Sequence, residues 1–252
     1  MVLKFEHFFP FVNENRKIHL YLPDDYYQEE EKYPVIYFFD GNNLFFDGDS
    51  IWGMSLQMEW YLKNYDKKFI VVGIEQPKDP YQRVKEHCPY KIYSHTFGDI
   101  DGNGDALIKW IINDLKPFID SNYRTLPFRE TTQLAGCSSA GVTSLYGAIK
   151  YNNYFSKTAL ISPYIVDTKY VLIHDIYHED INPDTKIFFS YGTNEYGNDF
   201  GMRSLCINNM YEVEYHLHSR NVKTYMFKNE NGEHNEISWR NEIFTWLDFL
   251  WK

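Results

Sequence analysis

The chain has 252 residues, of which 44% are hydrophobic and 24% charged, and its formal net charge is −10. This hydrophobic content excludes a disordered chain, and the acidic balance argues against nucleic acid or an anionic membrane surface as a partner. Aromatic residues reach 19%, an excess that predicts aromatic-walled grooves as well as an aromatic core. Lys4, Glu6 and His7 interrupt the N-terminal segment, so we expect no signal sequence, no membrane span and a cytoplasmic location.

Short apolar runs alternate along the chain with segments of helical periodicity. We expect strands at 17–22, 35–39, 69–74, 132–135, 158–161, 186–191 and 222–227. Apolar residues recur at helical spacing over 107–118, 202–217 and 239–250. Continuously apolar strands that alternate with helices are typical of a mostly parallel central sheet with helices on both faces. We therefore predict one α/β domain over residues 1–252, without a large lid, whose functional groups lie at the carboxyl ends of the strands.

One predicted strand runs into a turn that reads Gly-Cys-Ser-Ser-Ala-Gly, and a helix follows, as a nucleophile elbow requires. A serine at the tip of such a turn needs very small neighbours two residues before and two residues after it. Ser138 has Gly136 and Ala140 at these positions and is the favoured nucleophile, while Ser139 remains the alternative. Cys137 is expected to face the interior, where burial makes a thiol unreactive.

Two later strand ends carry an acid and a histidine. Glu195 follows the next-to-last predicted strand, and His234 follows the last one. The chain order serine, acid, histidine is that of α/β-hydrolases. In such a triad His234 accepts the proton of Ser138, and Glu195 fixes the imidazole tautomer. Asp199, four residues past Glu195, is the competing acid.

Acyl transfer also needs two backbone N–H groups that point at the developing oxyanion. We expect one of them from Ser139, which directly follows the nucleophile. The other is expected from Asn42, in the turn after the strand predicted at 35–39, where Gly41 lets the backbone turn closely.

Several segments together resemble the putative esterase family of α/β-hydrolases, which includes enterochelin and feruloyl esterases, S-formylglutathione hydrolase and the mycolyltransferases of the antigen 85 group. These segments are 20–26, 33–45, 83–89, 115–120, 123–125, 192–195 and 232–236 with Trp239. The family's elbow usually reads Gly-x-Ser-x-Gly-Gly, and here Ala140 replaces the first of the paired glycines. An ungapped match places the nucleophile at Ser138. The resemblance implies an α/β-hydrolase fold and either ester cleavage or acyl transfer.

We therefore predict a serine esterase that cleaves a small-molecule carboxylic ester through an acyl-enzyme, with Ser138, Glu195 and His234 as its catalytic residues. Two alternatives stay open: acyl transfer to a sugar or another alcohol, and a non-catalytic binding protein on the same fold. The sequence leaves the oligomeric state open.

Neither a cofactor nor a metal is expected. The segment 99–104 imitates the start of a calcium loop, but a tryptophan stands where the loop needs its bidentate glutamate. His174 and His178 lack a third ligand nearby and are expected on the wall of a short insertion over 163–185. Three aromatic residues are candidates for the pocket wall, although burial in the core is expected for any one of them: Trp52, Trp60 and Tyr93.

Overall fold

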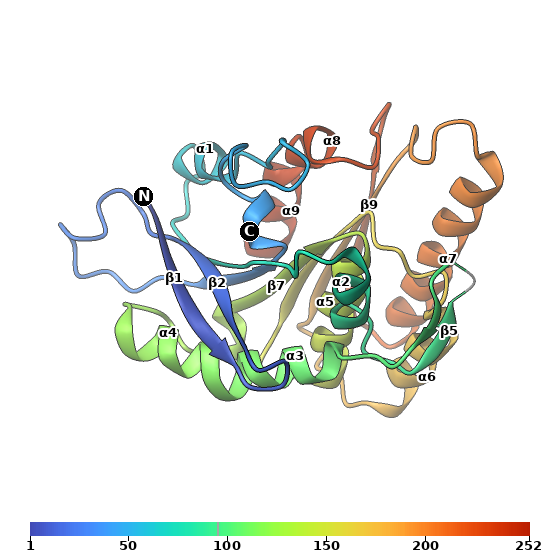
Figure 1. Ribbon diagram of the computed structural model, residues 1–252, viewed down its shortest axis with the longest axis horizontal. Coiled ribbons are helices and arrows are strands. Elements are labelled where there is room, and N and C mark those ends of the chain that lie inside the picture. Colours follow the sequence, from blue (N-terminus) through green and yellow to red (C-terminus); the bar gives the residue numbers. More distant parts are fainter. Residues whose placement is uncertain (95) are drawn as a thin grey trace.

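The computed structural model describes residues 1–94 and 96–252. Within these residues, an eight-stranded sheet with the order β1-β2-β4-β3-β7-β8-β9-β10 forms the centre of the molecule (Figure 1). Its strands are β1 (Val2–Phe9), β2 (Glu14–Tyr21), β3 (Val35–Phe39), β4 (Ile70–Ile74), β7 (Thr132–Cys137), β8 (Lys157–Ile161), β9 (Lys186–Gly192) and β10 (Lys223–Asn229). β1 and β2 run antiparallel, as do β2 and β4, whereas all pairs from β4 to β10 run parallel. A separate hairpin pairs β5 (Ile92–Ser94) with β6 (Gly98–Ile100).

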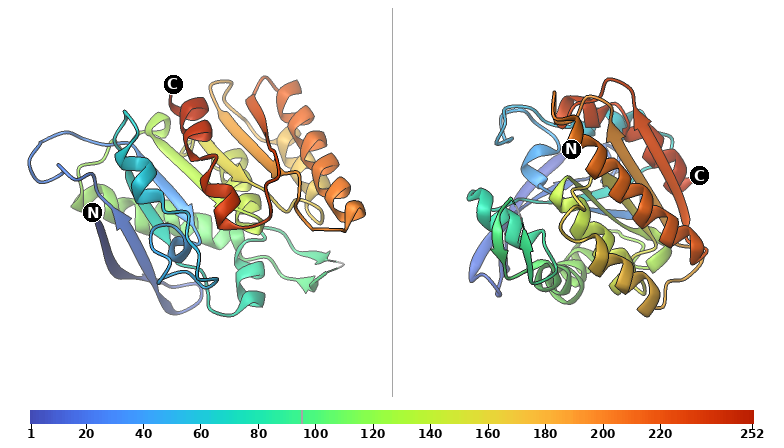
Figure 2. Two further views of the ribbon diagram at one scale, coloured as in Figure 1. Left: turned by 90° about the horizontal axis from the view of Figure 1, so that it is seen from above. Right: turned by 90° about the vertical axis from the view of Figure 1, so that its right-hand side faces the viewer.

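Helices cover both faces of the sheet (Figure 2). One face packs against α1 (Met58–Lys63) and α9 (Ile243–Trp251). The other face packs against five helices: α3 (Gly104–Trp110), α4 (Lys116–Asn122), α5 (Ser139–Lys150), α6 (Lys169–His178) and α7 (Phe200–Ser219). A π-helical turn, Ile111–Leu115, joins α3 to α4. Successive side chains of a strand point to opposite faces, so Tyr37 and Phe38 of β3 are both fully buried but belong to different layers. This double cover explains why the central strands are continuously apolar.

The predicted strands all occur, with ends that differ by a few residues. The predicted parallel sheet with helices on both faces is confirmed. Three features differ from the expectation, and the first is the β5–β6 hairpin, which was not expected. β1 was not expected, because it lies at the edge of the sheet and alternates half-buried with exposed side chains instead of forming an apolar run. The helix expected at 239–250 is two helices, α8 (Glu236–Arg240) and α9, which are separated at Asn241 and Glu242.

A buried ion pair fixes the position of α2 (Pro80–Glu86) against the antiparallel part of the sheet. Arg16 of β2 donates to both carboxylate oxygens of Glu86, at 2.8 and 2.7 Å, and both side chains are buried. The two parallel bonds orient α2 so that it lies beside the carboxyl ends of the strands. None of the helices in the described residues is long and apolar enough to span a membrane.

Candidate active site

The turn between β7 and α5 holds Ser138 in a backbone conformation that residues other than glycine rarely adopt. Ser138 has φ 58° and ψ −127° and directly precedes the first residue of α5. A Cβ atom at Gly136 would lie 2.6 Å from the carbonyl carbon of Ala140, so this position needs glycine. The end of β8 supports the turn, because the Ser138 N–H donates to the Ile161 carbonyl at 2.9 Å. The turn therefore has the geometry that the sequence predicts for a nucleophile elbow.

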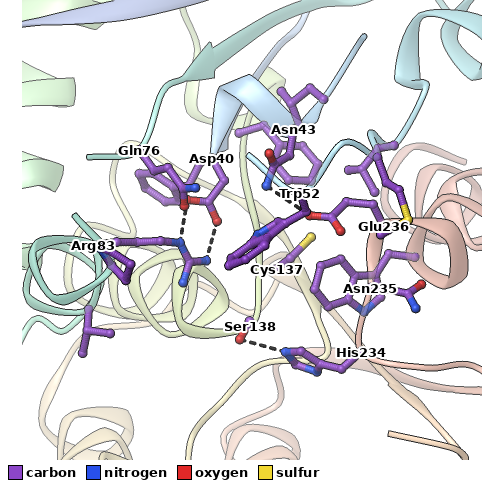
Figure 3. A pocket seen from close by; sticks show the side chains of 18 of the residues that line it. Asp40, Asn43, Trp52, Gln76, Arg83, Cys137, Ser138, His234, Asn235 and Glu236 are labelled. Atoms are coloured by element: carbon purple, nitrogen blue, oxygen red, sulfur yellow. Dashed lines mark hydrogen bonds and ion pairs between the residues drawn. The ribbon is translucent and has the colours of Figure 1, made fainter. Parts of the chain in front are cut away.

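The structure brings Ser138, His234 and Glu195 together in one hydrogen-bonded chain. His234 Nε2 lies 2.9 Å from Ser138 Oγ, and His234 Nδ1 lies 3.0 Å from Glu195 Oε2. Figure 3 shows the first of these contacts at the edge of a pocket. The three residues follow β7, β9 and β10, whose carboxyl ends lie at the same edge of the sheet because these strands are parallel.

Glu195 is 4% exposed and is held by more donors than His234 alone. Its Oε1 accepts the Ser162 hydroxyl at 2.5 Å and the Gly192 N–H at 2.8 Å. Ser162 Oγ in turn accepts the indole N–H of Trp239 at 2.9 Å. Burial alone would raise the pKa of Glu195, but these hydrogen bonds and the interaction with His234 lower it below its ordinary value. Glu195 is therefore a carboxylate near neutral pH, as an acid that orients a histidine must be.

Asp199, the competing acid, has a different structural role. It is exposed and precedes α7, where its carboxylate accepts the N–H of Met202 at 2.9 Å. This contact makes Asp199 the N-cap of α7. The residue that contacts His234 is Glu195.

The two backbone N–H groups predicted for the oxyanion lie at the starts of helices. Ser139 is the first residue of α5, and Asn42 lies in the short 3-10 helix Gly41–Asn43 after β3. The N–H groups in the first turn of a helix have no acceptor within that helix, so they can point at a bound anion. A Cβ atom on Gly41 would lie 2.3 Å from the carbonyl carbon of Gly73, so this turn requires a glycine where it packs against β4.

A charged network beside the elbow was not predicted. Arg83 of α2 donates through Nε and Nη2 to the two carboxylate oxygens of Asp40, and through Nη1 to Ser139 Oγ at 2.7 Å. His87 Nε2 lies 3.1 Å from Asp40 Oδ1. Burial alone would raise the pKa of Asp40, but the charges of Arg83 and His87 hold it well below its usual range. The network ties the Ser139 side chain to the turn that carries Asn42. The only sequence signal was that Arg83 lies in a segment resembling the esterase family.

A cavity of about 650 Å³ opens beside Ser138 and His234 (Figure 3). Its wall is mostly aromatic and aliphatic, with Phe38, Phe39, Leu44, Trp52, Met54, Leu56, Pro80, Tyr81, Val84, Phe97 and Trp239. Polar groups enter it at Asp40, Asn43, Gln76, Arg83, Asn235 and Glu236. A second cavity of about 410 Å³ adjoins Ser138 and His234 on the side of α7 and is lined by Tyr164, Tyr196 and Met202, among others.

Four sequence expectations about the surroundings of this cavity are corrected by the structure. Cys137 is buried, but it does not face only the interior, since it also lines the cavity (Figure 3). Burial raises the pKa of its thiol well above the ordinary value, which keeps it protonated and unreactive. The expectation that Trp52, Trp60 and Tyr93 are buried in the core is wrong, because these side chains are 64%, 58% and 66% exposed. Of the three, Trp52 lines the cavity.

The other sequence candidates lie away from the site. His174 and His178 lie in α6, within the expected insertion, with their rings stacked at 3.9 Å. The segment that resembles a calcium loop ends at Asn103, the N-cap of α3, and Gly104, and the next residue, Asp105, accepts hydrogen bonds from Tyr146 and Tyr151.

The mostly parallel sheet, its helices on both faces and the strained turn at Ser138 define an α/β-hydrolase fold. The family described as Putative esterase matches residues 10–250, and the chain belongs to this family. Two uncharacterised proteins of Bacillus subtilis strain 168 are similar in sequence. YbbA is 27% identical over 185 residues, which cover 72% of this chain and 69% of that protein. YjcH is 29% identical over 185 residues, or 73% of this chain and 69% of that protein.

Solved structures of the same fold include esterases. An IroE-like serine hydrolase of Shewanella oneidensis superposes with a TM-score of 0.78 at 18% identity, covering 99% of this chain and 79% of its own. The enterobactin esterase of Shigella flexneri, solved in the presence of enterobactin, gives a TM-score of 0.75 at 16% identity and covers 100% of this chain but 58% of its own. A ferulic acid esterase gives a TM-score of 0.68 at 13% identity, with 99% and 97% coverage.

Proposed function

We propose that this protein is a carboxylic ester hydrolase that acts through an acyl-enzyme on Ser138. The observation that carries the proposal is the unbroken chain of hydrogen bonds from Ser138 through His234 to the buried carboxylate of Glu195. A serine hydroxyl at its ordinary pKa is a weak nucleophile, and a neutral imidazole at hydrogen-bonding distance is the group that activates it. Membership of the esterase family supports the same reaction.

In the proposed reaction, Ser138 Oγ attacks the ester carbonyl carbon while its proton moves to His234 Nε2. The N–H groups of Asn42 and Ser139 stabilise the oxyanion, and Glu195 stabilises the imidazolium through Nδ1. The imidazolium then gives its proton to the departing alcohol, which leaves an acyl group on Ser138. Water, deprotonated by His234, attacks this acyl group, and the carboxylic acid leaves as the serine regains its proton.

The two cavities beside Ser138 support an ester rather than a substrate with a single substituent. An ester carries one group on its carbonyl carbon and another on its oxygen, and each cavity can receive one of them. The larger cavity is mostly apolar, so it favours a substituent with aromatic or aliphatic surface.

The proposal is tested by comparing two alanine variants on one activated ester, such as p-nitrophenyl acetate. Ser138→Ala should abolish turnover while circular dichroism shows the fold unchanged. Ser139→Ala is the matched control, because it removes a neighbouring hydroxyl of the same size but keeps its backbone N–H. It should retain much of the activity, with some loss because Arg83 loses an acceptor. An active Ser138→Ala variant and an inactive Ser139→Ala variant would show that the nucleophile is misassigned. A wild-type protein without turnover on esters would count against hydrolysis itself.

A further inference from the structure

Glu236 places a buried carboxyl group in the larger cavity beside Ser138. It is the first residue of α8, two residues past His234, and is 5% exposed. Its side chain lines the same cavity as Ser138 and His234, as Figure 3 shows. The proposed reaction uses neither this group nor the amide of Asn43 that contacts it.

The acids around this cavity differ in what neutralises them. Asp40 has Arg83 and His87 as partners, and Glu195 has His234. Glu236 Oε1 accepts the neutral amide N–H of Asn43, at 3.0 Å, and among the described residues Glu236 forms no ion pair. A buried carboxylate without a cationic partner is costly, since a neutral hydrogen bond offsets only part of its lost hydration. Burial accordingly raises the pKa of Glu236.

Arg83, the arginine that lines this cavity, is engaged with other partners. Each of its three guanidinium nitrogens already makes a hydrogen bond, Nε and Nη2 to Asp40 and Nη1 to Ser139. Trp52, Phe97 and Trp239 contribute aromatic surface to the same cavity. Aromatic rings attract organic cations through the negative potential of their faces, which adds to the attraction of a carboxylate.

We propose that the larger cavity binds an organic ammonium group of the substrate, with Glu236 as its counter-ion and the aromatic wall around its carbon substituents. The ligand would then supply the positive partner that Glu236 lacks among the described residues. This inference rests on the proposed ester hydrolysis and names the class of ester: one whose acyl or alcohol part carries a cation.

The test uses matched pairs of esters that differ only in charge. Acetylcholine and 3,3-dimethylbutyl acetate have nearly the same shape, since a quaternary nitrogen in the first is a carbon in the second. A second pair places the same two groups on the acyl side of an activated ester. The measured quantity is the ratio of kcat/KM for the cationic ester to kcat/KM for the neutral ester, because this ratio cancels any loss common to both.

Wild-type protein should prefer the cationic member of at least one pair, and Glu236→Gln should lower the preference about tenfold or more. Glu233→Gln is the control, since it removes the same charge from an exposed acid nearby and should leave the ratio unchanged. A ratio that is the same in wild type and Glu236→Gln, or that falls equally in both variants, would overturn the inference.

The inference and the proposed function can fail separately. If the neutral esters are cleaved without a preference for the cation, only the cation site is refuted. If no ester is cleaved, the proposed function fails, and calorimetric titration with tetramethylammonium chloride then decides the inference. Wild-type protein should bind this cation at least about tenfold more tightly than Glu236→Gln does. Equal or absent binding would refute the site.

Discussion

Replacing Glu195 by glutamine should leave the fold intact and still remove most of the activity, because of the donors around this side chain. The Ser162 hydroxyl and the Gly192 N–H both donate to Oε1, so the amide oxygen of a glutamine would occupy that position. Its NH₂ group would then face His234 Nδ1, whose N–H donates to Glu195 Oε2 in the wild type. An imidazole that accepts at Nδ1 carries its proton on Nε2, and it cannot take the proton of Ser138.

The expected loss is large. The corresponding change in a serine protease lowers kcat about 10⁴-fold, which equals about 5.4 kcal/mol in the activation free energy. Asp199→Asn is the matched control, because asparagine caps a helix as well as aspartate does and kcat should change less than about threefold. The assay is kcat of both variants on one activated ester at about pH 7.5, with circular dichroism to check folding. A larger loss for Asp199→Asn, or a Glu195→Gln variant within tenfold of the wild type, would refute this reasoning.

Three further predictions concern groups around the site. Ser162→Ala removes a donor to Glu195 and the acceptor of the Trp239 indole N–H. Because a hydrogen bond to a charged group contributes about 1.5–3 kcal/mol, kcat should fall about tenfold to a hundredfold. An unchanged kcat would contradict a role of Ser162 in positioning Glu195. Burial raises the pKa of Glu242 well above its ordinary value of 4.5. The stability that the protonated Glu242 contributes is therefore complete below about pH 4.5. It is lost as the pH rises toward the folded-state pKa, by about 1.4 kcal/mol per pH unit. In urea unfolding, Glu242→Gln should therefore gain stability relative to the wild type from pH 5 upward, and a difference that does not vary with pH would be contrary to this expectation. Glu86→Ala leaves the buried Arg16 unpaired and should lower the free energy of unfolding by about 3–5 kcal/mol, whereas a loss below about 1 kcal/mol would mean that this ion pair adds little.

The central strands were predictable because helices cover both faces of the sheet, and strands buried on both faces have continuously apolar sequences. β3 and β9 are buried along almost their whole length and therefore read as continuous apolar runs. β1 carries charged and polar residues at alternate positions of an edge strand, and such a pattern is hard to tell from a loop. The break between α8 and α9 was missed because apolar residues keep helical spacing across it.

The site was predictable where chemistry follows directly from position along the chain. Ser138, Glu195 and His234 each follow a strand, so parallel pairing was enough to expect them at one edge, and the structure places them in contact. Their catalytic roles, like the oxyanion roles of Asn42 and Ser139, stay predictions.

Other parts of the site depend on pairings that local patterns do not reveal. Arg83 and Asp40 are 43 residues apart, and Asn43 and Glu236 are 193 apart. Taken singly, such residues are most often found on protein surfaces. Only the folded chain shows that they are buried and which partners they have.

The central claim is that Ser138 is a nucleophile activated by His234, and labelling with diisopropyl fluorophosphate tests it most directly. Tryptic cleavage after Arg129 and Lys150 gives a peptide, 130–150, that contains both Ser138 and Ser139, and fragmentation of this peptide in a mass spectrometer locates the adduct. The account predicts one phosphoryl adduct, on Ser138, that forms in native protein and is absent from denatured protein and from Ser138→Ala. An adduct on Ser139, or native protein that stays unlabelled, would contradict it.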